Sequence, residues 1–241
     1  MNDLLLILFL IFVGQTLGSL IGLIKKLGKV ALYGSLSFAA SMMVAISFLQ
    51  LIPEGLKYAP LFLIAISFFV GIAIMRIVDR LLPHINPELI KKEKPSVERS
   101  VTMLVIGIAL HNIPEGLAIG VGFAITAELG IAIALAIAIQ DFPENVATIV
   151  PLYGLIKKKA KSFIILVTTV LFEVAGFLIG YLALGGASLS WLGASLALAA
   201  GFMVYISVEE LIPSAQVKTY PKMAAAAVVL GVMCVLLTSL I

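Results

Sequence analysis

The sequence predicts an all-α integral membrane protein with eight transmembrane helices, arranged as three helices, a central pair and three more in an inverted repeat. Of its 241 residues, 62% are hydrophobic and only 12% are charged, against about 45–50% and about 25% in an ordinary soluble domain. The mean hydropathy of +1.19 applies to the whole chain, which leaves no polar stretch long enough for a soluble domain. A soluble enzyme is therefore excluded, and residues 1–241 are interpreted as a single polytopic membrane domain.

Eight apolar stretches are long enough to cross a bilayer, whose core of about 30 Å requires about 20 mostly apolar residues per helix. The first stretch lacks the basic segment and cleavage site of a signal peptide, so it is interpreted as a retained span. The only cysteine, Cys234, lies in an apolar run, so no disulfide framework or cysteine metal site is expected. The predicted spans are 4–24, 31–53, 60–82, 100–124, 127–151, 162–184, 190–212 and 222–241.

The loop cations predict the orientation of the chain. When the connections are assigned to alternate sides, Lys57 stands alone on one side and the other 15 of the 16 Lys and Arg residues fall on the opposite side. The positive-inside rule identifies that cationic side as cytoplasmic. Both termini should then lie outside the cytoplasm, with the chain in the cell (inner) membrane. The longest loop, 83–99, should be cytoplasmic, and its prolines and mixed charges argue against a folded domain there.

An internal repeat relates the two ends of the chain. Nine of fifteen positions are identical when 39–53 (AASMMVAISFLQLIP) is aligned with 199–213 (AAGFMVYISVEELIP). A weaker match aligns 15–22 with 173–180, which pairs the first span with the sixth. Because the second and seventh spans cross the membrane in opposite directions, the repeat is inverted. Inverted repeats are a recurrent transporter architecture, with the binding site at the repeat interface.

Four acidic residues lie near the middle of their predicted spans: Glu115, Asp141, Glu144 and Glu173. No Lys or Arg occurs between residues 102 and 156, so the sequence offers these acids no basic partner nearby. Each ionised carboxylate at the bilayer centre costs on the order of 2.5–3.5 kcal/mol on the insertion scale. A bound divalent cation would offset that cost best.

The spacing within two related motifs, HNIPEG at 111–116 and QDFPEN at 140–145, supports a metal site. Residues four apart lie on one face of a helix, so the first and fifth residues of each motif point together. The second residue of each motif projects about 100° further round the helix and can serve an adjacent position. Two metal positions that share carboxylates are therefore expected. The candidate ligands are His111, Asn112, Glu115, Gln140, Asp141, Glu144 and Glu173.

Proline lies inside both motifs. Pro114 and Pro143 each lack an N–H, so each should free the carbonyl four residues back and kink its helix. Irregular backbone at membrane depth is tolerated where it lines a cavity or is buried in protein. The ligand types of imidazole, carboxylate and carboxamide suit Zn²⁺, Fe²⁺, Mn²⁺, Co²⁺ or Cd²⁺ better than Cu(I).

Together with Glu173 and the order of the eight spans, these motifs resemble the Zrt/Irt-like (ZIP) family of divalent-metal transporters over essentially the whole chain. The resemblance implies a binuclear centre bridged by Glu115 and Glu144. In it, one metal is held by His111, Glu115, Gln140 and Glu144, and the second by Asn112, Asp141, Glu144 and Glu173. The family moves metal toward the cytoplasm, commonly as a homodimer, and an elevator-like motion of the first, fourth, fifth and sixth spans has been proposed for it.

Two departures from the family pattern affect metal choice and sensing. Many eukaryotic members have a histidine-containing motif in the fifth span where this chain has Gln140 and Glu144, so the chain resembles a prokaryotic branch with broader metal choice. The family's cytoplasmic loop is often rich in histidine. Here that loop offers only His84, Glu88, Glu93 and Glu98, which argues against a metal-sensing role.

Further polar residues in the second and seventh spans could line a pathway for the ion. Glu209 and Glu210 lie near the cytoplasmic end of the seventh span, where the alternative is a solvated helix end. Gln50 is the repeat counterpart of Glu210, near the outer end of the second span. Ser47 and Ser207 are either pathway or packing residues, since small residues let helices approach closely.

Three functional classes remain open from the residues alone. The first is a carrier of divalent metal cations with alternating access, for which the family resemblance implies zinc as the leading substrate. A cation channel is the second, because selectivity rings in channels are acidic too. The third is an intramembrane metalloenzyme, which is disfavoured because there is no HExxH motif and the central polar groups are already used as ligands. The expected partners are the metal ion, the lipid bilayer and a second copy of the chain, with no prosthetic group and no nucleic acid.

Overall fold

The computed structural model describes residues 2–24, 27–81 and 96–239, and in these residues the chain is helical, with no strand. Eight helices or helical runs are long and apolar enough to cross a membrane. The prediction of an all-α protein with eight membrane-length helices is thus confirmed. The elements are α1 (Asn2–Ile24), α2 (Lys29–Ile46), η1 (Ser47–Leu51), α3 (Ile52–Leu56), α4 (Leu61–Leu81), α6 (Val97–Ile125), α7 (Ala127–Ile156), α8 (Lys159–Thr168), α9 (Val170–Leu178), η2 (Ile179–Ala183), α10 (Leu189–Ile206), η3 (Ser207–Leu211), α11 (Ile212–Ser214) and α12 (Pro221–Thr238).

The observed helices extend some of the predicted spans. α6 begins at Val97, three residues before the predicted span, because Ser96 caps it: the Ser96 hydroxyl accepts a hydrogen bond from the Arg99 N–H at 3.2 Å. The last residues of the predicted 83–99 loop are therefore helical. Most of that loop, with His84, Glu88 and Glu93, lies outside the described residues.

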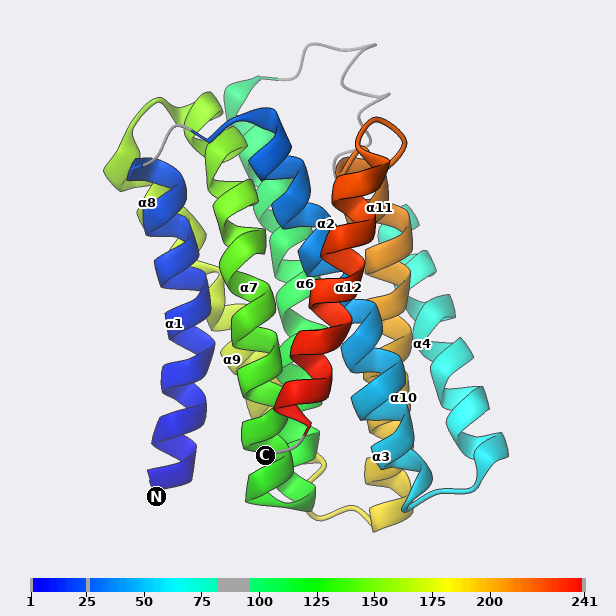
Figure 1. The fold of residues 1–241 in the computed structure, drawn as a ribbon. Helices are drawn as coiled ribbons and strands as arrows, with labels where there is room; N and C mark the ends of the chain where they lie inside the picture. Colours follow the sequence, from blue (N-terminus) through cyan, green and yellow to red (C-terminus); the bar gives the residue numbers. More distant parts are fainter. Residues whose placement is uncertain (1, 25–26, 82–95, 240–241) are drawn as a thin grey trace.

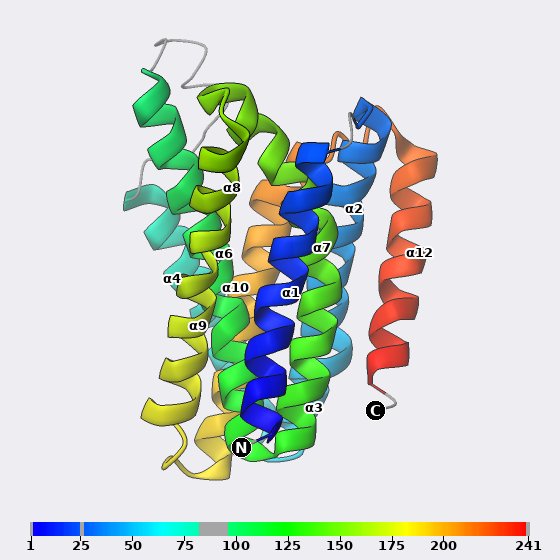
Figure 2. The ribbon, with the colours of Figure 1, turned by 90° about the vertical axis from the view of Figure 1, so that its left-hand side faces the viewer.

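The helices form one bundle, and both chain termini lie at the same end of it (Figures 1 and 2). α1 packs against α7, and α9 packs against α6, while α4 lies on α10 and α12 lies on α2. The start of α2, the turn between α7 and α8 and the start of α12 all lie at the opposite end from the termini (Figure 1). These connections carry Lys29, Lys157 to Lys159 and Lys222. Lys57 instead forms an ion pair with Glu54 at 2.6 Å, just after α3.

Glycines allow the central helices to pack so closely that their backbones are in contact. A Cβ at Gly18 on α1 would collide with the carbonyl oxygen of Phe142 on α7. Similarly, a Cβ at Gly176 on α9 would collide with the carbonyl oxygen of Ile113 on α6. There is also no room for a side chain at Gly116 on α6, because an added Cβ would overlap the Glu173 carbonyl group on α9. α1 and α7 are therefore in close backbone contact, as are α6 and α9.

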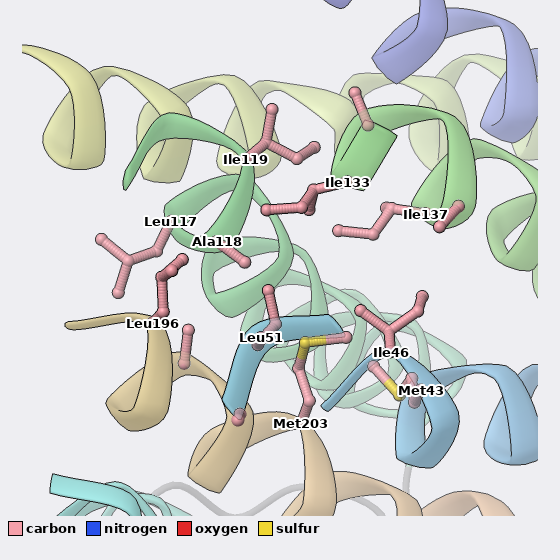
Figure 3. Close-up of a cluster of buried hydrophobic side chains, with 14 of the residues drawn as sticks. Met43, Ile46, Leu51, Leu117, Ala118, Ile119, Ile133, Ile137, Leu196 and Met203 are labelled. Carbon is pink, nitrogen blue, oxygen red and sulfur yellow. The ribbon is translucent and has the colours of Figure 1, made fainter. Parts of the chain in front are cut away.

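An apolar layer fills the bundle on one side of the HNIPEG and QDFPEN segments. Side chains from α2, η1, α6, α7 and α10 point toward one another there (Figure 3). The layer includes the fully buried Met43, Leu51, Ile119, Ile133 and Ile137. On α6 these residues follow the motif and on α7 they precede it, so the layer lies between the motifs and the end of the bundle that carries the termini.

Candidate metal site

α6 and α7 carry the two motifs at mid-helix and run as helices through both prolines. The departures from regular α-helix lie elsewhere: π-helical turns at η1, η2 and η3, and a break at Thr169 between α8 and α9. The sequence pointed to Pro114 and Pro143 as the irregular positions, but it gave no signal for these other sites. π-turns occur frequently at functional sites, and here η1 contains Gln50 and η3 contains Glu209 and Glu210.

Three carboxylates meet between α6 and α7. One oxygen from each of Glu115, Asp141 and Glu144 lies within 4.8 Å of the others, and all three residues are buried. The Nε2 of Gln140 joins two of them, because it donates to Glu115 and, at 3.4 Å, to Glu144. Gln140 itself is fully buried. Like charges this close are tolerable in a low-dielectric interior only with protons or a cation between them.

Glu173 approaches the group from α9, just beyond the break at Thr169. It is fully buried and accepts a hydrogen bond from the Nε2 of Gln15 on α1 at 2.7 Å. Its backbone lies against Gly116, the residue that follows Glu115 on α6. At the break in the sixth span, the Thr169 carbonyl oxygen accepts from the Phe172 N–H and from the Asn112 amide, each at 3.0 Å.

His111 lies on α6, one turn before Glu115, and faces η3. Its Nδ1 lies 2.7 Å from the Gly107 carbonyl oxygen, and because a carbonyl oxygen only accepts, Nδ1 is the donor in this hydrogen bond. Its Nε2 lies 3.5 Å from a carboxylate oxygen of Glu210 on η3. A neutral imidazole held in this way presents Nε2 as a metal ligand.

Several buried oxygens in this region have no hydrogen-bond donor among the described residues. They are Oε1 of Gln15, Oε1 of Gln140, Oδ2 of Asp141, Oδ1 of Asn145 and Oε1 of Glu173. A buried oxygen without a donor is expensive, and five in one region form an unusual concentration. All five are hard oxygen acceptors. The donor set therefore fits a divalent cation, and it does not fit an anion or an apolar ligand.

Of the predicted pathway residues, Glu210 contacts a proposed ligand, and within the described part of the chain the others form no hydrogen bond or ion pair with one. Glu210 reaches the site through His111, whereas Glu209 is exposed and lines a cavity of about 460 Å³ with Arg76 and Arg80. Gln50 is 6% exposed on η1. The hydroxyls of Ser47 and Ser207 bond to helix carbonyls four residues back, those of Met43 and Met203, which is the pattern of packing residues.

Two residues at the site were not among the sequence-based candidates. Gln15 had appeared only in the weaker repeat match, aligned with Glu173. Asn145 ends the QDFPEN motif, is 7% exposed, and donates to the Asp141 carbonyl oxygen at 3.0 Å. The signal that could have identified Gln15 was its alignment with an acid already chosen as a ligand.

The bundle and the buried acids define a multi-pass membrane protein with a site for cations inside it. A sequence model described as ZIP zinc transporter matches residues 91–239. The chain is also 33% identical over 219 residues to proteins named zinc transporter ZupT from Salmonella heidelberg, Salmonella arizonae and Salmonella newport, a match that covers 85% of this chain and 82% of each relative. The chain belongs to the ZIP zinc transporter family.

Family membership confirms the resemblance and removes one of the open classes. The family model and the named relatives are transporters, so the chain is a transporter and not an intramembrane metalloenzyme. Its expected substrate is a metal ion, and the family implies no prosthetic group.

Proposed function

We propose that this chain carries zinc into the cytoplasm through a binuclear site between α6 and α7. The observation that supports it best is the buried group of Glu115, Asp141 and Glu144, with the backbone of the buried Glu173 against Gly116, next to Glu115. Four carboxylates carry four negative charges, which two divalent cations would neutralise. In this assignment His111, Glu115, Gln140 and Glu144 hold one ion, and Asn112, Asp141, Glu144 and Glu173 hold the other. Fe²⁺, Mn²⁺, Co²⁺ and Cd²⁺ suit the same donors and are proposed as further substrates.

We further propose alternating access, with a carrier rather than a channel as the mechanism. The apolar layer drawn in Figure 3 would separate the site from the end of the bundle that carries the termini, because its residues follow the motif on α6 and precede it on α7. On the other side, His111 contacts Glu210, whose side chain is 22% exposed. A site that is closed on one side and approached by a partly exposed acid on the other is expected of a carrier in one of its end states.

An inverted 3+2+3 repeat is supported by pairs of equivalent contacts. Gly18 meets the Phe142 carbonyl and Gly176 meets the Ile113 carbonyl, as expected if 18 corresponds to 176 and 142 to 113. The π-helices η1 and η3 begin 160 residues apart, at Ser47 and Ser207, which is the offset that aligns 39–53 with 199–213. In the proposed elevator, the close glycine contacts would bind α1 to α7 and α6 to α9, so that the first, fourth, fifth and sixth spans move together.

The membrane orientation and assembly are part of the same proposal. The cationic connections at the end opposite the termini would face the cytoplasm, so both termini would lie outside it, in the inner membrane. The single domain 1–241 would assemble as a homodimer.

Metal uptake into proteoliposomes tests the transport proposal. We expect uptake of ⁶⁵Zn²⁺ that saturates with concentration, competition by Cd²⁺, Co²⁺, Fe²⁺ and Mn²⁺, and no resolvable single-channel current. Empty liposomes provide the control. Non-saturating flux with unitary currents would favour the channel, and no flux above the control for any of the five ions would reject transport.

The contact between Glu210 and His111 predicts that Glu210 serves the exit side of the site. Glu210→Gln should lower zinc uptake about 10-fold. Loss of a residue that contacts a metal ligand typically lowers metal affinity or activity by about 10-fold to 100-fold, and the lower value is expected because Glu210 is partly exposed. Glu98→Gln, an exposed acid in the first turn of α6, is the matched control and should leave uptake unchanged. Equal uptake by the two variants would remove Glu210 from the pathway.

A further inference from the structure

Gln15 and Glu173 join α1 to α9 through a single buried hydrogen bond. Gln15 is 1% exposed and Glu173 is 0% exposed, and the amide Nε2 donates to one carboxylate oxygen, Oε2, at 2.7 Å. The other carboxylate oxygen, Oε1, has no partner among the described residues. The hydrogen bond therefore fixes the rotation of the Glu173 carboxylate and leaves one oxygen available for a cation.

The backbone of α1 holds Gln15 rigidly at this place. A Cβ at the preceding residue, Gly14, would overlap the Ala138 carbonyl oxygen and lie 3.0 Å from the Cβ of Asp141. One turn further along, Gly18 lies equally close to α7, at Phe142. Such contact leaves α1 no freedom to move away from the segment of α7 that carries Asp141. The Gln15 amide is thus preorganised, which is how a supporting residue controls the geometry of a ligand.

The residue type at position 15 also sets the charge of the site. In the proposed repeat, Gln15 is the counterpart of Glu173, so a symmetric site would have a carboxylate at both positions. With glutamine, the site contains four buried acids, Glu115, Asp141, Glu144 and Glu173, which balance two divalent cations, whereas Glu210 beyond His111 is 22% exposed and is solvated. A fifth buried carboxylate would leave one negative charge uncompensated at membrane depth, which is strongly unfavourable. That extra charge would favour keeping the metal bound.

We infer that Gln15 is a positioning residue for zinc: it orients the Glu173 carboxylate by a hydrogen bond and, as an uncharged amide, keeps the metal-loaded site neutral so that the ion can leave. This inference rests on the proposed transport function and deepens it. It assigns a role in metal binding and release to α1, which contributes none of the proposed ligands.

Two substitutions at Gln15 should change zinc handling in opposite directions. Gln15→Leu keeps the bulk but removes the donor, so one of the two zinc ions should bind about 10-fold to 100-fold more weakly, and KM for uptake should rise. Gln15→Glu adds the fifth carboxylate, so zinc should bind at least about 10-fold more tightly at neutral or alkaline pH, and KM and kcat should both fall. Equilibrium dialysis against ⁶⁵Zn²⁺ measures the binding, and proteoliposome uptake measures KM and kcat.

Ser19→Ala is the matched control, because Ser19 lies one turn away on the buried face of α1. It should bind zinc as the wild type does. Thermal unfolding of each variant without metal separates a loss of packing from a loss of positioning. The inference is overturned if Gln15→Leu binds both ions with wild-type affinity, or if Gln15→Glu raises KM and weakens binding as Gln15→Leu does. A wild-type protein that binds no zinc would instead reject the proposed function itself.

Discussion

Replacing Glu144 by alanine should abolish zinc uptake and weaken zinc binding by at least about 100-fold. Removing a residue that only contacts a metal ligand already lowers metal affinity by up to about 100-fold, and Glu144 is a proposed ligand itself. Glu144 lies within reach of both Glu115 and Asp141, and it accepts a hydrogen bond from Gln140. With Glu115 it is one of the two proposed bridging residues, and it stands in both proposed ligand sets, so its removal takes one ligand from each metal position. Uptake into proteoliposomes and equilibrium binding of ⁶⁵Zn²⁺ measure the two effects.

The matched control for this variant is Glu128→Ala on the same helix. Glu128 is exposed in the first turn of α7, far from the carboxylate group. It should transport and bind zinc as the wild type does. If Glu144→Ala took up zinc at the wild-type rate, the binuclear site would be wrong even if the chain is a zinc transporter.

The second large effect is expected at Gly116, where α6 and α9 are in backbone contact. A Cβ there would overlap the carbonyl group of Glu173, and backbone cannot move aside as a flexible side chain can. Overpacking costs typically about 1–3 kcal/mol, and Gly116→Ala should reach or exceed the upper value. The melting temperature of the purified protein in detergent should therefore fall by roughly 6–12 °C or more, and zinc binding should fall with it because Glu173 is displaced.

Gly107→Ala provides the control for this packing argument, since it makes the same change on the same helix. A Cβ at Gly107 would meet nothing within 4 Å, so alanine should be neutral or stabilise α6 by up to about 1 kcal/mol through its helix propensity. A Gly116→Ala protein that melts at or above the temperature of Gly107→Ala would contradict the close contact between α6 and α9.

The helical architecture could be predicted from the sequence, because the insertion of a helix into the membrane depends on the local composition of the chain. An apolar stretch of about 20 residues predicts a span wherever it occurs, and all eight stretches became membrane-length helices. The grouping of Glu115 with Glu144 could be anticipated in part, since helical spacing places the ligands of each motif on one face. That the two faces meet, with their carboxylates within 4.8 Å, required the packing of α6 on α7.

Other features of the site could not be predicted because they depend on contacts between distant segments. The hydrogen bond from Gln15 to Glu173 joins residues 158 positions apart, and the approach of Glu210 to His111 depends on how η3 lies against α6. The break at Thr169 could not be predicted because no proline or glycine lies near it in the sequence. Conversely, Pro114 and Pro143 lie within continuous helices, because a proline removes one hydrogen bond without ending the helix when packing on both sides supports it.

Anomalous diffraction from crystals of the zinc-loaded protein, measured at the zinc absorption edge, tests the central claim most directly. Two strong peaks are expected inside the bundle, one bounded by His111, Glu115, Gln140 and Glu144 and the other by Asn112, Asp141, Glu144 and Glu173. Zinc peaks confined to the surface of the protein, with none among the carboxylates of α6, α7 and α9, would contradict it.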